Sequence, residues 1–389
     1  MSKSRPKVFY PSYACLILLF AGVSLLQIVP FPELFIKIIS PNTFLLYQQY
    51  LPKSEAINFY SIALYAFPVK MEIVKMVCYS TIFLITLNLF NSKKQLKRAF
   101  LMVILWGLFL CFCGIMKKYF IIDKETLNSF GTFGNRNHFS GYMLMIAPLA
   151  IGYALHCRNK AKKIIFSFIA SLICASIFLS LSRGGTISLV LSLLLMGLFF
   201  KDKRFNKERS IVLSVVLVLG IFFVLIAGIN PAIEKFSLLG QGARGRLEIV
   251  KDSIEMFRSF PIFGVGNGNF SYIFPIYKKF VSSAHYFYAH NDYLQLILEN
   301  GLLGVFFYLG FFCFVLKEII TKLAARNDPF VKNMVSGGLC GLFGVMIHSV
   351  FEFNFHIPAI SFLFLFVLAL IYKCVNTHFD PVKNNLESR

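Results

Sequence analysis

The residue best suited to acid–base chemistry is His290, which begins the polar part of the string AHNDYLQLILENG. A neutral imidazole titrates near ambient pH and is the usual general base for a hydroxyl nucleophile. Asn291 or Asp292 can cap a helix that starts directly after it, so His290 stands at a helix entrance. A structural histidine in a polar loop is the alternative interpretation, and His285 is the nearby competitor.

Three arginines could bind an anion. Arg244 and Arg246, in GARGR, precede a stretch in which apolar residues recur at helical spacing, so an amphipathic helix is expected to begin at them. Free N–H groups and the helix dipole favour an anion there, and a guanidinium can grip phosphate oxygens with two bonds. Arg183, in SRGG, falls between two apolar runs, where a charge usually has a partner or a ligand. Contact with lipid headgroups is the alternative for all three.

Two further polar strings flank apolar runs, GTFGNRNHF and HSVFEFNFHIP. Their side chains suit a sugar or phosphate site, but they could equally be helix caps and interface anchors. The candidate binding residues in them are Asn135, Arg136, Asn137, His138, Glu352 and His356, to which Asn291 is added from the His290 string. A third string, GVGNGN, lacks the strand and helix of a dinucleotide-binding unit and predicts a glycine-rich turn.

The composition requires lipid as the solvent. Of 389 residues, 57% are hydrophobic and 46 are Phe, and the mean hydropathy is +0.70. The formal charge of +21 comes from short basic clusters between apolar runs, which excludes a nucleic-acid-binding module. The nine Cys form no CxxC pair, and no P-loop or acidic metal cluster is visible, so neither a metal nor a cofactor is expected.

Apolar runs of spanning length predict an all-α, polytopic transmembrane helix bundle of about 10–12 spans with a large, partly helical periplasmic loop. The first run is read as a retained span and not a signal peptide. Residues 1–228 and 301–389 are expected to hold the transmembrane helices, and residues 229–300 the loop. Ten spans are placed, at 12–31, 72–91, 99–116, 138–155, 164–181, 185–200, 210–228, 301–316, 334–350 and 359–374.

The basic clusters alternate with the apolar runs, which places both termini in the cytoplasm and every second loop outside. All the polar strings named above then fall on the outer side of the membrane. The sequence therefore predicts one site at that face, formed by residues at the ends of several helices.

Taken in order, GTFGNRNHF, SRGG, GARGR, PIFGVGNGNF, AHNDYLQLILENG and FEFNFHIP resemble the O-antigen ligase and polymerase superfamily of bacterial membrane glycosyltransferases, over roughly residues 130 to 360. The resemblance implies transfer of a glycan from undecaprenyl pyrophosphate to an acceptor hydroxyl, on the periplasmic face of the inner membrane and without metal or cofactor. It implies that His290 is the base and that Arg183 and Arg246, with Arg244 beside it, hold the pyrophosphate. Glu352 stands where relatives often show Asp.

The resemblance leaves the acceptor open. A ligase would use a sugar of the lipid A core, a polymerase a second repeat unit, and an O-oligosaccharyltransferase a protein. Two other classes are a membrane transporter, which needs a polar site near the midplane on broken helices, and a scaffold. Polar residues crowd one face here, which favours the enzyme. The expected partners are the lipid-linked donor, the acceptor and membrane lipid, and no nucleic acid.

Overall fold

The chain is an all-α helix bundle, as the sequence predicts. The computed structural model describes residues 15–50, 58–120, 129–199 and 239–377, with Pro11 and several positions between 212 and 222. Within these ranges the strands are limited to β1 (Phe31–Pro32) and β2 (Phe59–Tyr60), which pair antiparallel.

Seven of the described helices are long and apolar enough to cross a membrane. They are α4 (Ala66–Leu89), α5 (Lys93–Phe120), α6 (Arg136–His156), α7 (Lys160–Leu179), α13 (Asp292–Ala324), α14 (Pro329–His348) and α15 (Pro358–Asn376). Two predicted spans correspond to shorter apolar helices, α1 (Cys15–Leu26) and α8 (Arg183–Phe199). The predicted span 210–228 lies largely outside the described residues.

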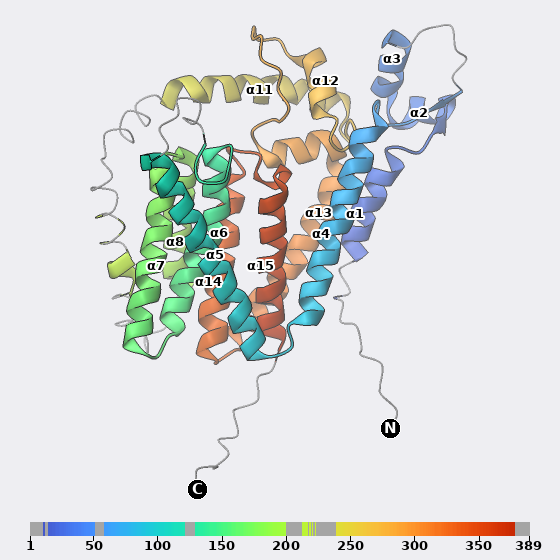
Figure 1. The fold of residues 1–389 in the computed structure, drawn as a ribbon. Helices are drawn as coiled ribbons and strands as arrows, with labels where there is room; N and C mark the ends of the chain where they lie inside the picture. The colour runs from blue at the N-terminus through green and yellow to red at the C-terminus, as the bar shows by residue number, and fades with distance from the viewer. Residues whose placement is uncertain are drawn as a thin grey trace, which may run out of the picture.

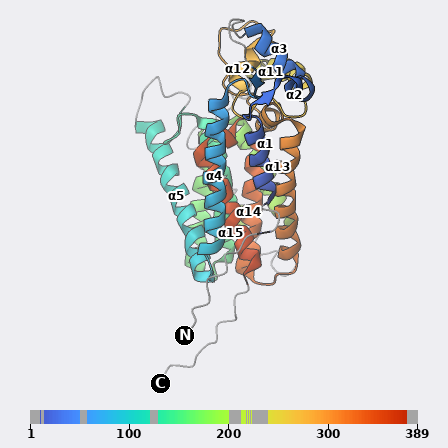
Figure 2. The ribbon, with the colours of Figure 1, turned by 90° about the vertical axis from the view of Figure 1, so that its right-hand side faces the viewer.

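Further helices complete the end of the bundle that carries the polar strings. They are α2 (Glu33–Ile39), α3 (Pro41–Tyr50), α11 (Leu239–Ser259), α12 (Phe270–Tyr277) and the 3-10 helix η4 (Asn354–His356). Figure 1 shows α11 lying across this end, above the long helices, and Figure 2 shows α2, α3, α11 and α12 gathered there.

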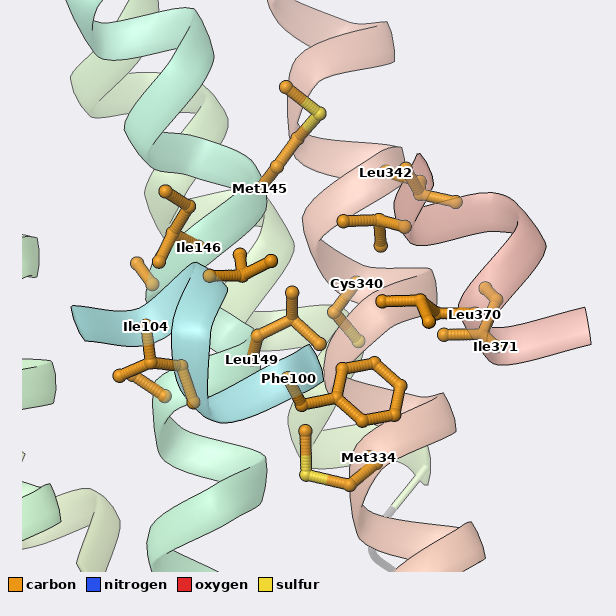
Figure 3. Close-up of a cluster of buried hydrophobic side chains, with 14 of the residues drawn as sticks. Phe100, Ile104, Met145, Ile146, Leu149, Met334, Cys340, Leu342, Leu370 and Ile371 are labelled. Atoms are coloured by element: carbon orange, nitrogen blue, oxygen red, sulfur yellow. The ribbon is translucent and has the colours of Figure 1, made fainter. Parts of the chain in front are cut away.

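Helix α6 forms the centre of the bundle and packs most closely on α14 and α7. Glycines allow the approach, because a Cβ at Gly337 would lie 2.5 Å from the carbonyl oxygen of Pro148. Small residues at helix contacts are the usual means of close packing in membranes. Around this contact, apolar side chains from α5, α6, α14 and α15 interlock, as Figure 3 shows for Phe100, Leu149, Met334 and Ile371.

The helices alternate in direction, so their ends segregate by chemistry. Helices α6, α8, α13 and α15 all start at the end covered by α11, while the start of α5 and the α6–α7 and α13–α14 turns lie at the opposite end (Figure 1). The basic clusters at 93–98, 158–163 and 317–332 belong to that opposite end, and the polar strings belong to the α11 end. Lys117 and Lys118, in the last turn of α5, are basic residues at the α11 end.

The amphipathic helix predicted after Gly240 is present as α11, but it starts earlier than expected. Because α11 begins at Leu239, Arg244 and Arg246 lie inside it, and the prediction that they sit at its N-terminus is wrong. Glycine costs only about 1 kcal/mol in a helix interior, so GQGARG continues the helix when the packing favours it. The buried face of α11 contains Ile249 and Met256, whereas Leu247, the first apolar residue after GARGR, is exposed.

The GVGNGN string is a glycine-rich turn, as predicted, and it docks on a kink in α13. Gly264 and Gly301 both have positive φ, 69° and 61°, and a Cβ on Gly301 would lie 2.2 Å from the carbonyl oxygen of Ile262. The amides of residues 264–269 are all bonded within the chain, among them Gly268 N to Glu299 Oε2 at 2.9 Å and Asn267 N to Gln27 Oε1 at 2.9 Å. These amides therefore do not form a phosphate cradle.

Candidate functional site

Glu352 is the centre of the polar cluster at the α11 end. It lies between α14 and η4, and its side chain is only 2% exposed. Its Oε1 accepts hydrogen bonds from Asn137 Nδ2 at 2.6 Å and from a terminal nitrogen of Arg246 at 2.5 Å. Its Oε2 lies 3.5 Å from Nδ1 of His290. One buried carboxylate thus joins α6, α11 and the segment before α13.

Burial alone would raise the pKa of Glu352, because a low dielectric disfavours the charged form. The contact with His290 and the positive charge of Arg246 outweigh burial, and the pKa lies below its ordinary value. Glu352 is therefore an anion at neutral pH.

His290 is held in an unusual backbone conformation immediately before the cap of α13. Its φ is 52°, in the left-handed region that non-glycine residues rarely occupy. Of the two candidates, Asn291 is the cap, and its Oδ1 accepts from the amides of Tyr293 and Leu294, both at 3.0 Å. The imidazole stands edge-on to Phe353 with the ring centroids 5.0 Å apart, and 34% of its side chain is exposed. One ring nitrogen thus faces the carboxylate while the ring keeps access to solvent.

Two further arginines lie close to this centre. Arg136 and Arg183 are the first residues of α6 and α8, and they are near enough to repel each other electrostatically, while Glu352 attracts Arg136. Both are half-buried. Arg246 reaches the same carboxylate with a side chain that is 41% exposed. Arg136 and Arg246 interact with the carboxylate and Arg183 lies beside Arg136, so the three guanidinium groups outnumber Glu352 and leave a net positive site that suits an anion.

The two glycines of SRGG explain how Arg183 reaches this position. A Cβ on Gly184 would lie 2.9 Å from Cδ2 of His348, and a Cβ on Gly185 would lie 2.5 Å from Cβ of Ser140. Without side chains at these positions, the start of α8 packs directly on the end of α14 and on α6. The motif therefore brings the first residue of α8 beside the first residue of α6.

The floor of the site is polar and buried. His348 and Asn354 are fully buried, with His348 Nδ1 3.3 Å from Asn354 Nδ2. His138 is also buried, and its ring stands edge-on to Phe353 at 4.7 Å between centroids. His138 thus supports the ring that contacts His290.

His356 lies on the flank of the site in an ion pair with Asp292. His356 Nδ1 is 2.9 Å from Asp292 Oδ1, and Asp292 is 5% exposed. Burial would lower the pKa of His356, but the bond to Asp292 outweighs it, and the pKa is raised. The sequence pattern predicts only a capping role for Asp292, because its partner lies 64 residues away and no local pattern signals such a contact.

The structure thus brings together His290, Arg246, Asn137 and Glu352, with Arg136 and Arg183 beside them. Asn135 caps α6, with its side chain accepting from the amide of Asn137. The competitor His285 is exposed and contacts the ring of Phe287. The side chain of Arg244 lies outside the described residues. In the described part of the chain, no group of three or more His, Cys, Asp or Glu residues is arranged to hold a metal ion.

This fold and site define a multi-pass membrane protein with a cationic, histidine-containing site at one end of its helices. Residues 166–309 match the family model described as O-Antigen ligase, so this segment of the chain is similar to that family, in line with the resemblance of the sequence motifs. The matched segment runs from α7 into α13 and contains Arg183, Arg246 and His290. The strings that carry Asn137 and Glu352 lie outside it, so their resemblance stays a prediction. A comparison with curated proteins finds no match.

Proposed function

We propose that this chain transfers a glycan from a polyprenyl-pyrophosphate carrier to an acceptor hydroxyl on the periplasmic face of the inner membrane. In the ligase form of this reaction the acceptor is a sugar of the lipid A core. The observation that carries the proposal is that the buried carboxylate of Glu352 lies between a partly exposed histidine and a partly exposed arginine.

His290 is the general base. In the tautomer that carries its proton on Nδ1, which lies 3.5 Å from Glu352 Oε2, Nε2 is unprotonated and can take the proton of the acceptor hydroxyl. The acceptor oxygen then bonds to the anomeric carbon as the bond from that carbon to the pyrophosphate oxygen breaks. The proton stays on the imidazole, and the anion of Glu352 stabilises the imidazolium, as a buried carboxylate does in a serine protease.

The arginines bind and neutralise the leaving group. A pyrophosphate carries its charge on several oxygens, and guanidinium groups bind such oxygens in pairs. Arg136 and Arg183 begin helices, so the amides and dipoles of α6 and α8 add to their charge. Because the pyrophosphate is already a good leaving group, orientation and charge neutralisation supply most of what the reaction requires.

The distribution of basic residues supports the proposed periplasmic position of the site. The basic clusters at 93–98, 158–163 and 317–332 gather at the end of the bundle opposite the site, and such clusters favour the cytoplasm. Reporter fusions after Asn159 and after Gly268 are therefore expected to give cytoplasmic and periplasmic signals. The reverse pattern would place the site on the wrong side for this reaction.

The test of the function is transfer by the purified protein from a polyprenyl-pyrophosphate glycan to a defined acceptor. His290→Ala is expected to slow transfer by about 10²–10⁴-fold, the usual contribution of a positioned base, with donor binding retained. His285→Ala is the matched control, since that residue is exposed and outside the cluster. Full transfer by His290→Ala would refute the assignment, and products longer by repeat units would make the chain a polymerase.

A further inference from the structure

Asp292 joins the two segments that carry the proposed base and its carboxylate partner. It follows His290 and Asn291 in sequence and is the first residue of α13. Its own amide donates to the carbonyl of Ser349 at 2.9 Å, and its Oδ2 accepts from the amide of Phe355 at 3.0 Å. The segment 349–355, which carries Glu352, is thus attached to Asp292 at both of its ends.

His356 adds a third attachment to the same residue. Its Nδ1 lies 2.9 Å from Oδ1 of Asp292, so both carboxylate oxygens are bonded to consecutive residues of the other segment. The ring of His356 also lies 5.0 Å from that of Tyr288, which stacks on Phe353 at 4.3 Å. A movement of Asp292 or His356 would therefore displace Phe353, the ring that stands against His290.

We propose that Asp292 and His356 are positioning residues, which hold Glu352 and Phe353 in register with the base His290. The inference rests on the proposed function for its kinetic consequences, but the geometry itself does not. Glu352 is bonded to Asn137 and Arg246 and faces His290, whereas the carboxylate of Asp292 is bonded to Phe355 and His356. Their effect must therefore act through the 349–356 segment.

The first experiment measures transfer. Asp292→Ala and His356→Ala should each lower kcat by about 10- to 100-fold, since a misplacement of 1 Å can cost about 100-fold. The KM for the donor should change less than threefold, because Arg136, Arg183 and Arg246 are untouched. His356→Gln should recover most of the rate, because its amide can still donate to Asp292. The double variant should be no slower than Asp292→Ala alone, since Asp292→Ala already removes the bond that His356→Ala removes.

Asp328→Ala is the matched control. Asp328 also caps a helix, accepts from the amide of Phe330 at 2.8 Å and pairs with a cation, Lys93, at 2.5 Å, but it lies at the opposite end of the bundle. It should keep the wild-type kcat. An equal loss of kcat in Asp328→Ala and Asp292→Ala, or no better rate for His356→Gln than for His356→Ala, would overturn the proposal.

The second experiment does not depend on transfer. Diethyl pyrocarbonate modifies histidines, and peptide mass spectrometry gives the modification rate of His290 relative to exposed His285 in the same molecule. Release of Phe353 should raise this ratio by about threefold or more in Asp292→Ala and His356→Ala, as the ring loses its cover. The ratio should be unchanged in Asp328→Ala. An unchanged ratio in both site variants would overturn the positioning role, whereas an inactive wild type with the expected ratios would overturn only the proposed function.

Discussion

Replacing Glu352 by Gln should separate the chemistry of transfer from donor binding. The substitution keeps the size of a buried side chain and removes its charge. The carboxylate lies 3.5 Å from His290 Nδ1, so a charge pair there is worth about 1.2 kcal/mol at a dielectric constant of 80 and about 4.7 at 20. His290 is one-third exposed, which favours the lower part of this range. We expect kcat to fall by about 10- to 100-fold.

Donor binding should respond in the opposite sense. One terminal nitrogen of Arg246 is bonded to Glu352. In Glu352→Gln the neutral amide would bind this guanidinium less tightly, so that it could bind the pyrophosphate. The KM for the donor should therefore stay constant or fall. The assay is initial-rate transfer at varied donor concentration, with Glu255→Gln as the control, because Glu255 pairs with Lys279 on the exposed side of α11. A raised donor KM with an unchanged kcat would refute the role given to Glu352.

The remaining predictions concern the anion site, the kink, pH and metal. Arg183→Lys should keep part of the transfer rate and Arg183→Ala should lose more, as measured by kcat/KM, because lysine keeps the charge without the paired bonds. Gly301→Ala should lower the melting temperature, since its φ is 61° and a Cβ would lie 2.2 Å from Ile262 O. His356 has a raised pKa through Asp292, so its ion pair stabilises the fold fully below the ordinary value of 6.5. That contribution is lost as pH rises through the raised value, and the difference in melting temperature between wild type and His356→Gln should shrink accordingly. Transfer should persist in the presence of a chelator and in the absence of ATP. A requirement for an added divalent metal ion or for ATP would contradict the mechanism.

The helices could be predicted because their signals are local. A run of about 20 apolar residues must satisfy its backbone by forming a helix, whatever surrounds it. The cap at Asn291 was equally local, since an amide side chain before an apolar run bonds the first free N–H groups. The predicted span at 301–316 nevertheless missed the first turns of α13. Those turns lie before Gly301, where the helix bends to receive Ile262 and the glycine turn.

The contacts of the site could not be predicted because they depend on tertiary packing. Arg246 and Glu352 are 106 residues apart, and Asn137 is 215 residues from the same carboxylate. The face of α11 that is buried also depends on tertiary packing. Its buried stripe includes Ile249 rather than Leu247, a rotation that its apolar pattern alone did not specify.

What the sequence does specify is the face on which the reactive residues meet. A charge inside a span is costly, so charged residues move to helix ends, and Arg136, Arg183 and Asp292 are each the first residue of a helix. Helices α6, α8 and α13 run in the same direction, so their first residues share one end of the bundle (Figure 1). Hydropathy and the alternating direction of the helices thus determine which residues lie at this end of the bundle. The pairings within it, such as Asp292 with His356, are left to the packing of the helices that carry them.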